Sequence, residues 1–101
     1  MSVLVTVKLS GDTHVFRRTL EERADELVKV SEQGKAAGAI HHRFGIGDGF
    51  VLVVDEWESP AHFEKFFSDP ELQAFIGSAG GDTSQPPEIT ITEAVSSADE
   101  F

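Results

Sequence analysis

The chain has 101 residues with a formal net charge of −10, and it contains no cysteine. A chain of this length forms one domain, and its acidic excess argues against nucleic acid and anionic membrane surfaces as partners because both are negatively charged. The missing thiols exclude disulfide scaffolds, thiolate metal sites and cysteine nucleophiles.

The N-terminal residues alternate in the manner of a β-strand. From Val3 to Leu9, β-branched and aliphatic residues recur at every second position, which predicts a strand. This start lacks the basic segment and long apolar run of a signal peptide. The longest apolar run, Phe50 to Val54, is too short to cross a bilayer. We therefore expect a cytoplasmic protein.

The first helix is predicted over residues 20–33. Residues 10–14 contain a glycine and an aspartate and are typical of a loop. Thr19 and Glu22 then match a capping box, in which the threonine accepts from a backbone N–H and the glutamate reaches back. Apolar residues at helical spacing follow, and Gly34 is a plausible end of the helix.

A β-hairpin follows this helix. Residues 38–45 form the second predicted strand and residues 50–57 the third, which is the most apolar of all. The connection, residues 45–49, is rich in glycine and short, so the two strands pair antiparallel.

The second helix has clear start signals. Ser59-Pro60 places serine at the N-cap and proline at the first helical position. Asp69-Pro70 repeats this signal, so we expect the helix to break and resume there. Its apolar stripe extends to Ile76.

The remainder of the chain supplies one more strand. Residues 77–87 have no apolar anchor and are expected to form an exposed loop. Residues 89–95 alternate as a fourth strand, and residues 96–101 form a flexible acidic tail. We therefore predict a single domain over residues 1–95.

The element order β-α-β-β-α-β predicts an α+β, ferredoxin-like fold with a four-stranded antiparallel sheet. Right-handed crossovers place both helices on one sheet face. The first and fourth strands lack the clean polar alternation of a face exposed to water. We therefore expect the second face to be covered by the sheet of another copy, forming a homodimer, although edge strands can also have mixed patterns.

One stretch carries a family resemblance. Residues 51–76 read VLVVDEWESPAHFEKFFSDPELQAFI, an apolar strand that ends in Asp55 and Trp57 and leads through Ser59 into a helix with Phe63. This resembles the dimeric α/β-barrel superfamily that includes antibiotic-biosynthesis monooxygenases. The resemblance implies a sheet-to-sheet dimer that forms an α/β barrel. Because this superfamily hosts several activities, it does not decide the function.

The sequence departs from the haem-degrading branch of that superfamily. An ungapped alignment from Trp57 puts Phe66 where that branch has a tryptophan and Ile76 where it has an iron-ligating histidine. Isoleucine cannot ligate iron. The resemblance therefore favours an enzyme that works without a cofactor.

The candidate catalytic residues are His41, Arg43 and Asp55. A hairpin loop over residues 45–49 would pair His41 with Val53 and would put the three side chains on one sheet face, whereas a one-residue change of register would swap the faces. His41 could then act as a general base, and Arg43 could stabilise an oxyanion. Alternatively, the three side chains pair with one another or across a subunit interface.

A pocket between helices and sheet would hold the substrate. Its predicted lining consists of Trp57, Phe63, Phe66 and Phe67, although aromatic residues at helical spacing also form ordinary cores. No histidine or carboxylate spacing indicates a metal site.

Two functions follow from these observations. The first is a cofactor-independent monooxygenase acting on a small aromatic or polyketide-like molecule. The alternative is a non-catalytic dimeric module that binds a small apolar ligand or has a structural role.

Overall fold

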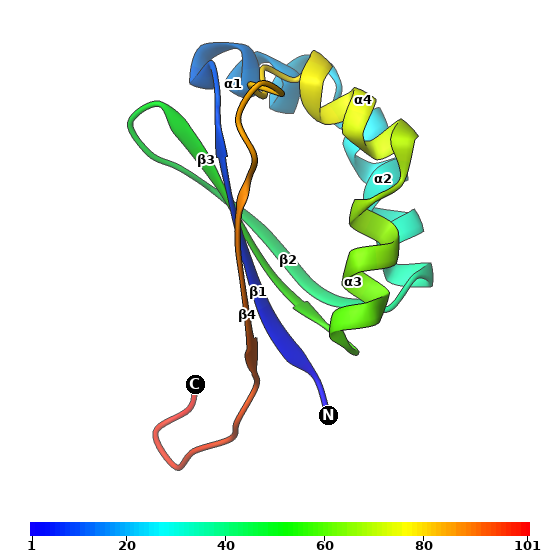
Figure 1. Cartoon of the computed structure of the whole chain (residues 1–101), viewed down its shortest axis with the longest axis vertical. Coiled ribbons are helices and arrows are strands. Elements are labelled where there is room, and N and C mark those ends of the chain that lie inside the picture. The colour runs from blue at the N-terminus through cyan, green and yellow to red at the C-terminus, as the bar shows by residue number, and fades with distance from the viewer.

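Eight secondary-structure elements make up the protein, and a computed structural model describes all residues, 1–101. Figure 1 shows a sheet on one side and a layer of helices on the other. In chain order the elements are β1 (Val3–Ser10), α1 (Thr13–Glu22), α2 (Ala24–Ala36), β2 (Ala39–Ile46), β3 (Phe50–Trp57), α3 (Pro60–Phe67), α4 (Pro70–Ser78) and β4 (Glu88–Glu93). The predicted β-α-β-β-α-β order is confirmed, with each helical segment divided into two helices. We call α1–α2 the first arm and α3–α4 the second arm.

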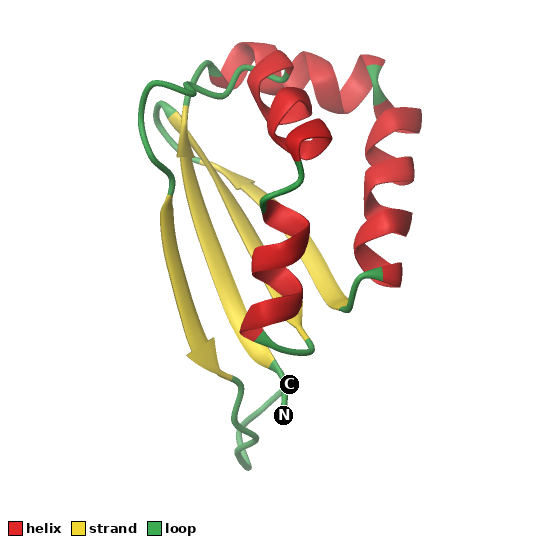
Figure 2. Cartoon of the chain, turned by 45° about the vertical axis from the view of Figure 1, so that its right-hand side comes forward, coloured by secondary structure: helices red, strands yellow, loops and turns green.

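The sheet is antiparallel with strand order β2-β3-β1-β4. Both arms lie on one face, and no helix covers the other (Figure 2). The core lies under the second arm, where Val5 and Val7 of the central strand β1 are almost fully buried beside Trp57 and Phe63. The alternation in β1 therefore has its expected cause, since odd-numbered residues face the helices.

The first arm differs from its prediction. Residues 10–14 are not all loop, because Asp12 caps α1 by accepting hydrogen bonds from the backbone N–H groups of His14 and Val15 at 2.9 and 3.3 Å. Thr19 is no cap; it is buried inside α1, and its hydroxyl donates to the carbonyl of Val15 at 3.0 Å. The capping-box prediction is wrong because the helix has already begun at the earlier cap.

The end of the first arm is also later than predicted. α2 continues through Gly34 to Ala36, and the turn falls at Gly38, whose φ is +114°. This left-handed backbone favours glycine. Gly34 instead lies inside α2 on the side that faces α3, where a Cβ would make ordinary contact with Phe66, 3.6 Å from its Cζ.

The second arm confirms the predicted starts and the break. The Ser59 hydroxyl accepts from the N–H of His62 at 3.2 Å, with Pro60 in the first turn of α3. The Asp69 carboxylate accepts from the N–H of Glu71 at 2.8 Å at the start of α4. Both caps are local, so the sequence alone was sufficient to locate them.

The segment after α4 is partly anchored, which corrects the prediction of an exposed loop from residue 77. α4 runs to Ser78, and Ala79 is buried. Gly11 and Gly81 form an isolated β-bridge, and a Cβ on Gly11 would lie 2.2 Å from the carbonyl oxygen of Gly80. The close approach of these two backbones requires glycine.

The last strand, β4, ends at Glu93. None of the four helices is long and apolar enough to cross a membrane.

The register of the hairpin differs from the predicted one. His41 pairs with Glu56 rather than Val53, a shift of three positions along β3. β2 extends to Ile46, the N–H of Gly47 donates to the carbonyl of Phe50 at 2.9 Å, and an irregularity lies between Ala39 and His41. Because an odd shift reverses the facing sets, His42 is on the helix side and His41 on the open side.

Candidate active site

An apolar cavity of about 410 Å³ lies between the helix-covered sheet face and the two arms. Eighteen of its 28 lining residues are hydrophobic, so an occupant must be largely apolar. All four helices and the first three strands contribute to the lining, among them Val7, Phe16, Val30, His42, Phe44, Val53, Asp55, Trp57, Phe63, Phe66, Phe67, Leu72 and Phe75.

A chain of hydrogen bonds runs along the wall of this cavity. Nδ1 of His42 lies 2.7 Å from Oδ1 of Asp55, and Nε1 of Trp57 donates to Oδ2 of Asp55 at 3.1 Å. The Asp55 side chain is 8 % exposed, whereas that of His42 is 40 % exposed. A buried carboxylate must be paired to be tolerated, and here each oxygen has one donor.

These contacts determine the tautomer of His42. An ionised Asp55 only accepts hydrogen bonds, so Nδ1 of His42 is the donor. In the neutral imidazole this leaves Nε2 with a free lone pair. The ring of His42 is held edge-on against Phe44, with centroids 4.6 Å apart and planes at 84°. The histidine is therefore oriented on two sides, and its second nitrogen can accept a proton.

Aromatic side chains form the end of the cavity near Trp57. The centroid of its ring lies 5.8 Å from that of Phe63 and 5.4 Å from that of Phe66, and the rings of Phe63 and Phe67 are stacked at 5.3 Å. Trp57 and Phe63 are buried core residues, whereas Phe66 and Phe67 are only partly buried. The latter two therefore offer ring surface to an occupant of the cavity.

Six of the seven residues that the sequence singled out line the cavity. They are Arg43, Asp55, Trp57, Phe63, Phe66 and Phe67. The expectation that His41 and Arg43 lie on the same sheet face as Asp55 is wrong. Their register partners are Glu56 and Val54.

His41 and Arg43 therefore lie on the open face of the sheet. Arg43 borders the cavity, but its position between His42 and Phe44 directs its Cβ to the open side. Neither residue therefore has the position beside Asp55 that the predicted register gave it.

The residue that this prediction missed is His42. One signal was present in the sequence: Phe44 and Ile46 are apolar at even positions of β2, whereas Arg43 and Gly45 alternate with them. In a strand with one buried face, the apolar set faces the core. That pattern favours the cavity side for His42, and the pairing of the strands decides it.

No group of three or more histidine, aspartate or glutamate side chains converges in the geometry of a metal site. The His42–Asp55 pair is a hydrogen-bonded pair of ionisable side chains in the cavity wall. Chemically, this pair can hold and release a proton beside an apolar compartment.

Solved structures with this fold include named oxygenases. A monooxygenase of Streptomyces coelicolor in complex with nanaomycin D is 18 % identical, with a TM-score of 0.68 over 99 % of this chain and 93 % of that one. SnoaB, a cofactor-independent oxygenase from Streptomyces nogalater, is 13 % identical, with a TM-score of 0.58 over 98 % of each chain. Rv0793 from Mycobacterium tuberculosis is 14 % identical, with a TM-score of 0.61 over 98 % of this chain and 100 % of that one.

Neither the family models nor the curated proteins match this sequence. The structural matches confirm the fold that the Asp55–Phe63 resemblance implied, the ferredoxin-like fold of antibiotic-biosynthesis monooxygenases. At these identities the likeness concerns the fold alone.

Proposed function

We propose that this protein is a cofactor-independent monooxygenase that oxidises a small aromatic or polyketide-like molecule in the cavity between sheet and helices. The observation that carries the proposal is the His42–Asp55–Trp57 chain of hydrogen bonds on a largely apolar wall. Such a wall accepts fused rings, and the single basic nitrogen addresses one acidic proton. The oxygenases that share the fold support this choice of chemistry.

His42 acts as the base. Its Nε2 removes a proton from an activated ring CH₂ or a phenol, and Asp55 stabilises the imidazolium that forms. The resulting anion is delocalised over the rings and transfers electrons to O₂, which is the oxidant. For a ring methylene the balance is R₂CH₂ + O₂ → R₂C=O + H₂O, and the imidazolium returns its proton as the O–O bond breaks. Phe66 and Phe67 hold the rings by stacking and contact.

The protein also forms a homodimer through the open sheet face. Leu4 and Val54 are 47 % and 45 % exposed there, and covering them with a second copy would remove apolar surface from water. Arg43 and Glu56 flank this apolar centre on adjacent strands. A two-fold axis through the face could pair each with its opposite charge, which favours a second copy over an unrelated partner.

The test compares two neighbouring histidines. His42→Ala and His41→Ala would be assayed by oxygen uptake on a panel of anthrones and quinols, with anaerobic turnover as the blank. We expect His42→Ala to lower kcat by about 10²–10⁴-fold. His41→Ala should leave kcat within about twofold, because His41 lies on the sheet face away from the cavity. Equal activity of the two variants would contradict the assignment of His42 as the base.

A second outcome has its own meaning. If the panel binds in the cavity with micromolar affinity but is not oxidised, the protein is a carrier of apolar ligands. The small number of polar groups in the cavity wall would then serve orientation only.

A further inference from the structure

A second hollow, of about 280 Å³, lies on the outer side of the helix layer. Its lining comes from α2, α3 and α4 and the α3–α4 junction, namely Glu26, Lys29, Val30, Gln33, Phe66, Asp69, Glu71, Leu72 and Phe75. Four of these residues, Val30, Phe66, Leu72 and Phe75, also line the main cavity. The two hollows therefore lie back to back, separated by a single layer of four apolar side chains.

The two arms touch at both ends of this hollow. At one end Gly34 of α2 faces Phe66 of α3, and a Cβ on Gly34 would make ordinary contact with that ring, 3.6 Å from its Cζ. At the other end Arg23, at the α1–α2 junction, reaches across to α4. Its Nη1 donates to the hydroxyl of Ser78 at 2.9 Å, and its guanidinium carbon lies 4.6 Å from the ring centroid of Phe75.

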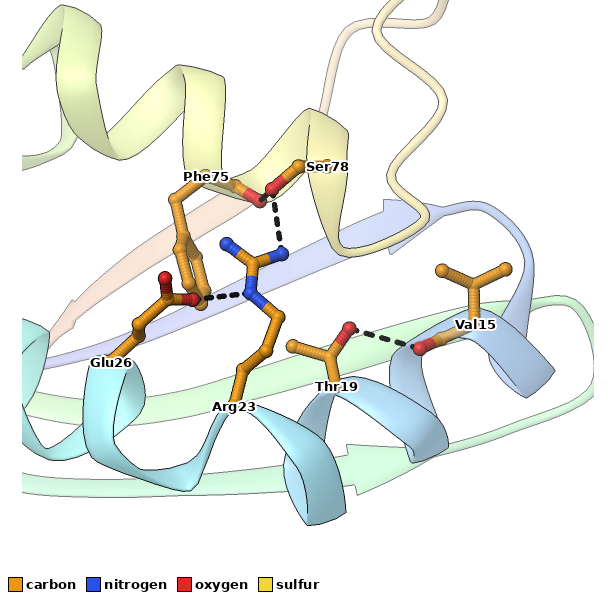
Figure 3. Close-up of polar contacts among 6 residues, drawn as sticks. All are labelled: Val15, Thr19, Arg23, Glu26, Phe75 and Ser78. Carbon is orange, nitrogen blue, oxygen red and sulfur yellow. Dashed lines mark hydrogen bonds and ion pairs between the residues drawn. The ribbon is translucent and has the colours of Figure 1, made fainter.

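Arg23 is held in this position by further contacts (Figure 3). Its Nε pairs with the carboxylate of Glu26 one turn along α2. The Ser78 hydroxyl that receives its hydrogen bond donates in turn to the carbonyl of Phe75 at 2.8 Å. The Phe75 ring and the backbone that carries it are thus both tied to one arginine, which we call the Arg23 clasp.

We propose that the outer hollow is the entrance through which an apolar ligand reaches the cavity, that Phe75 is its gate, and that the Arg23 clasp holds the gate closed. The proposal rests on the proposed function in one respect, namely that the cavity receives an apolar ligand. Phe75 suits this role because its half-buried ring belongs to both hollows. Rotation of that ring joins the hollows without any movement of the sheet.

The charge of the entrance adds selectivity. Its rim carries three acidic side chains, Glu26, Asp69 and Glu71, against one basic side chain, Lys29, and Glu26 is paired with Arg23. The remaining excess of negative charge lowers the local concentration of anions. Uncharged ligands should therefore enter faster than anions of similar size.

The gate is tested by stopped-flow fluorescence with 1-aminoanthracene, an uncharged aromatic probe. Arg23→Met keeps the length of the side chain but removes its charge and hydrogen bonds, and Arg18→Met on the exposed surface of α1 is the matched control. We expect Arg23→Met to raise the association and dissociation rate constants together by about fivefold, so that Kd stays within about twofold. Unchanged rate constants in Arg23→Met would overturn the gate.

The position of the entrance is tested with an anionic probe, 8-anilinonaphthalene-1-sulfonate. Glu71→Gln should raise its association rate constant about twofold and Lys29→Gln should lower it by a similar factor, with both effects fading at high salt. The uncharged probe should not respond. If neither variant changes the rate for the anion, entry occurs elsewhere, for example along the β2 edge where His42 is 40 % exposed.

These readouts are independent of turnover. Loss of oxidation in all assays with intact gating kinetics would refute the proposed enzyme and leave the entrance standing. Failure of both probes to bind the unaltered protein would overturn the entrance itself.

Discussion

Replacing Asp55 by asparagine should separate stability from catalysis at this site. The change is nearly isosteric, but it converts an acceptor of two hydrogen bonds into a group with one oxygen and one NH₂. Two donors, Nδ1 of His42 and Nε1 of Trp57, now compete for that oxygen.

Burial decides this competition. The Trp57 residue is 2 % exposed, so its N–H cannot turn to water, and leaving it unpaired would cost about 1–3 kcal/mol. The His42 side chain is 40 % exposed and can be solvated. The asparagine oxygen therefore faces Trp57, and its NH₂ faces Nδ1 of His42. That nitrogen must become the acceptor, and the proton moves to Nε2.

The consequence is a folded protein with the wrong histidine tautomer. We expect the free energy of unfolding of Asp55→Asn to lie within about 1 kcal/mol of that of the unaltered protein, because every buried donor keeps a partner. Oxidation should fall by about 10²–10⁴-fold, since a protonated Nε2 cannot act as a base. Asp55→Ala, which leaves the Trp57 N–H unpaired, should lose both activity and about 2–3 kcal/mol of stability.

The assay is urea unfolding followed by tryptophan fluorescence, together with oxygen uptake. Trp57 is the only tryptophan, so the signal reports on this site directly. Full turnover by Asp55→Asn would refute the tautomer argument. A loss of stability in Asp55→Asn as large as in Asp55→Ala would refute the argument from burial.

Three further changes test the fold and the dimer. Val54→Lys places a charge at the centre of the open sheet face and should give a species of about half the mass by light scattering at micromolar concentration, whereas a monomeric unaltered protein would contradict the dimer. Gly38→Ala should lower the free energy of unfolding by about 1–2 kcal/mol in urea, because the φ of +114° is strained for alanine and its Cβ would lie 3.0 Å from His62; a neutral result would show that the turn relaxes. Ser59→Ala removes the cap of α3 and should cost about 1 kcal/mol in thermal unfolding, with Ser59→Asp restoring it.

Signals that act within a few residues were readable from the sequence. Ser59-Pro60 and Asp69-Pro70 start α3 and α4 because a cap bonds to an N–H only two or three residues away. The Thr19 prediction failed for a related reason, since Asp12 offered an equally local cap and the packing of Phe16 against the sheet selected the longer arm.

The assignment of His42 to the cavity was a tertiary decision. One histidine or the other had to face the helices, but which one depended on the extent of β2, the tightness of the turn at Gly47 and the irregularity after Ala39. Each of these is set by pairing between strands. The sequence by itself therefore determined the order of the elements, the placement of both helical segments on one sheet face, and the aromatic residues that line the cavity. Only the folded chain determined which imidazole meets Asp55 and where the arms leave an opening, because both depend on contacts between residues far apart in the chain.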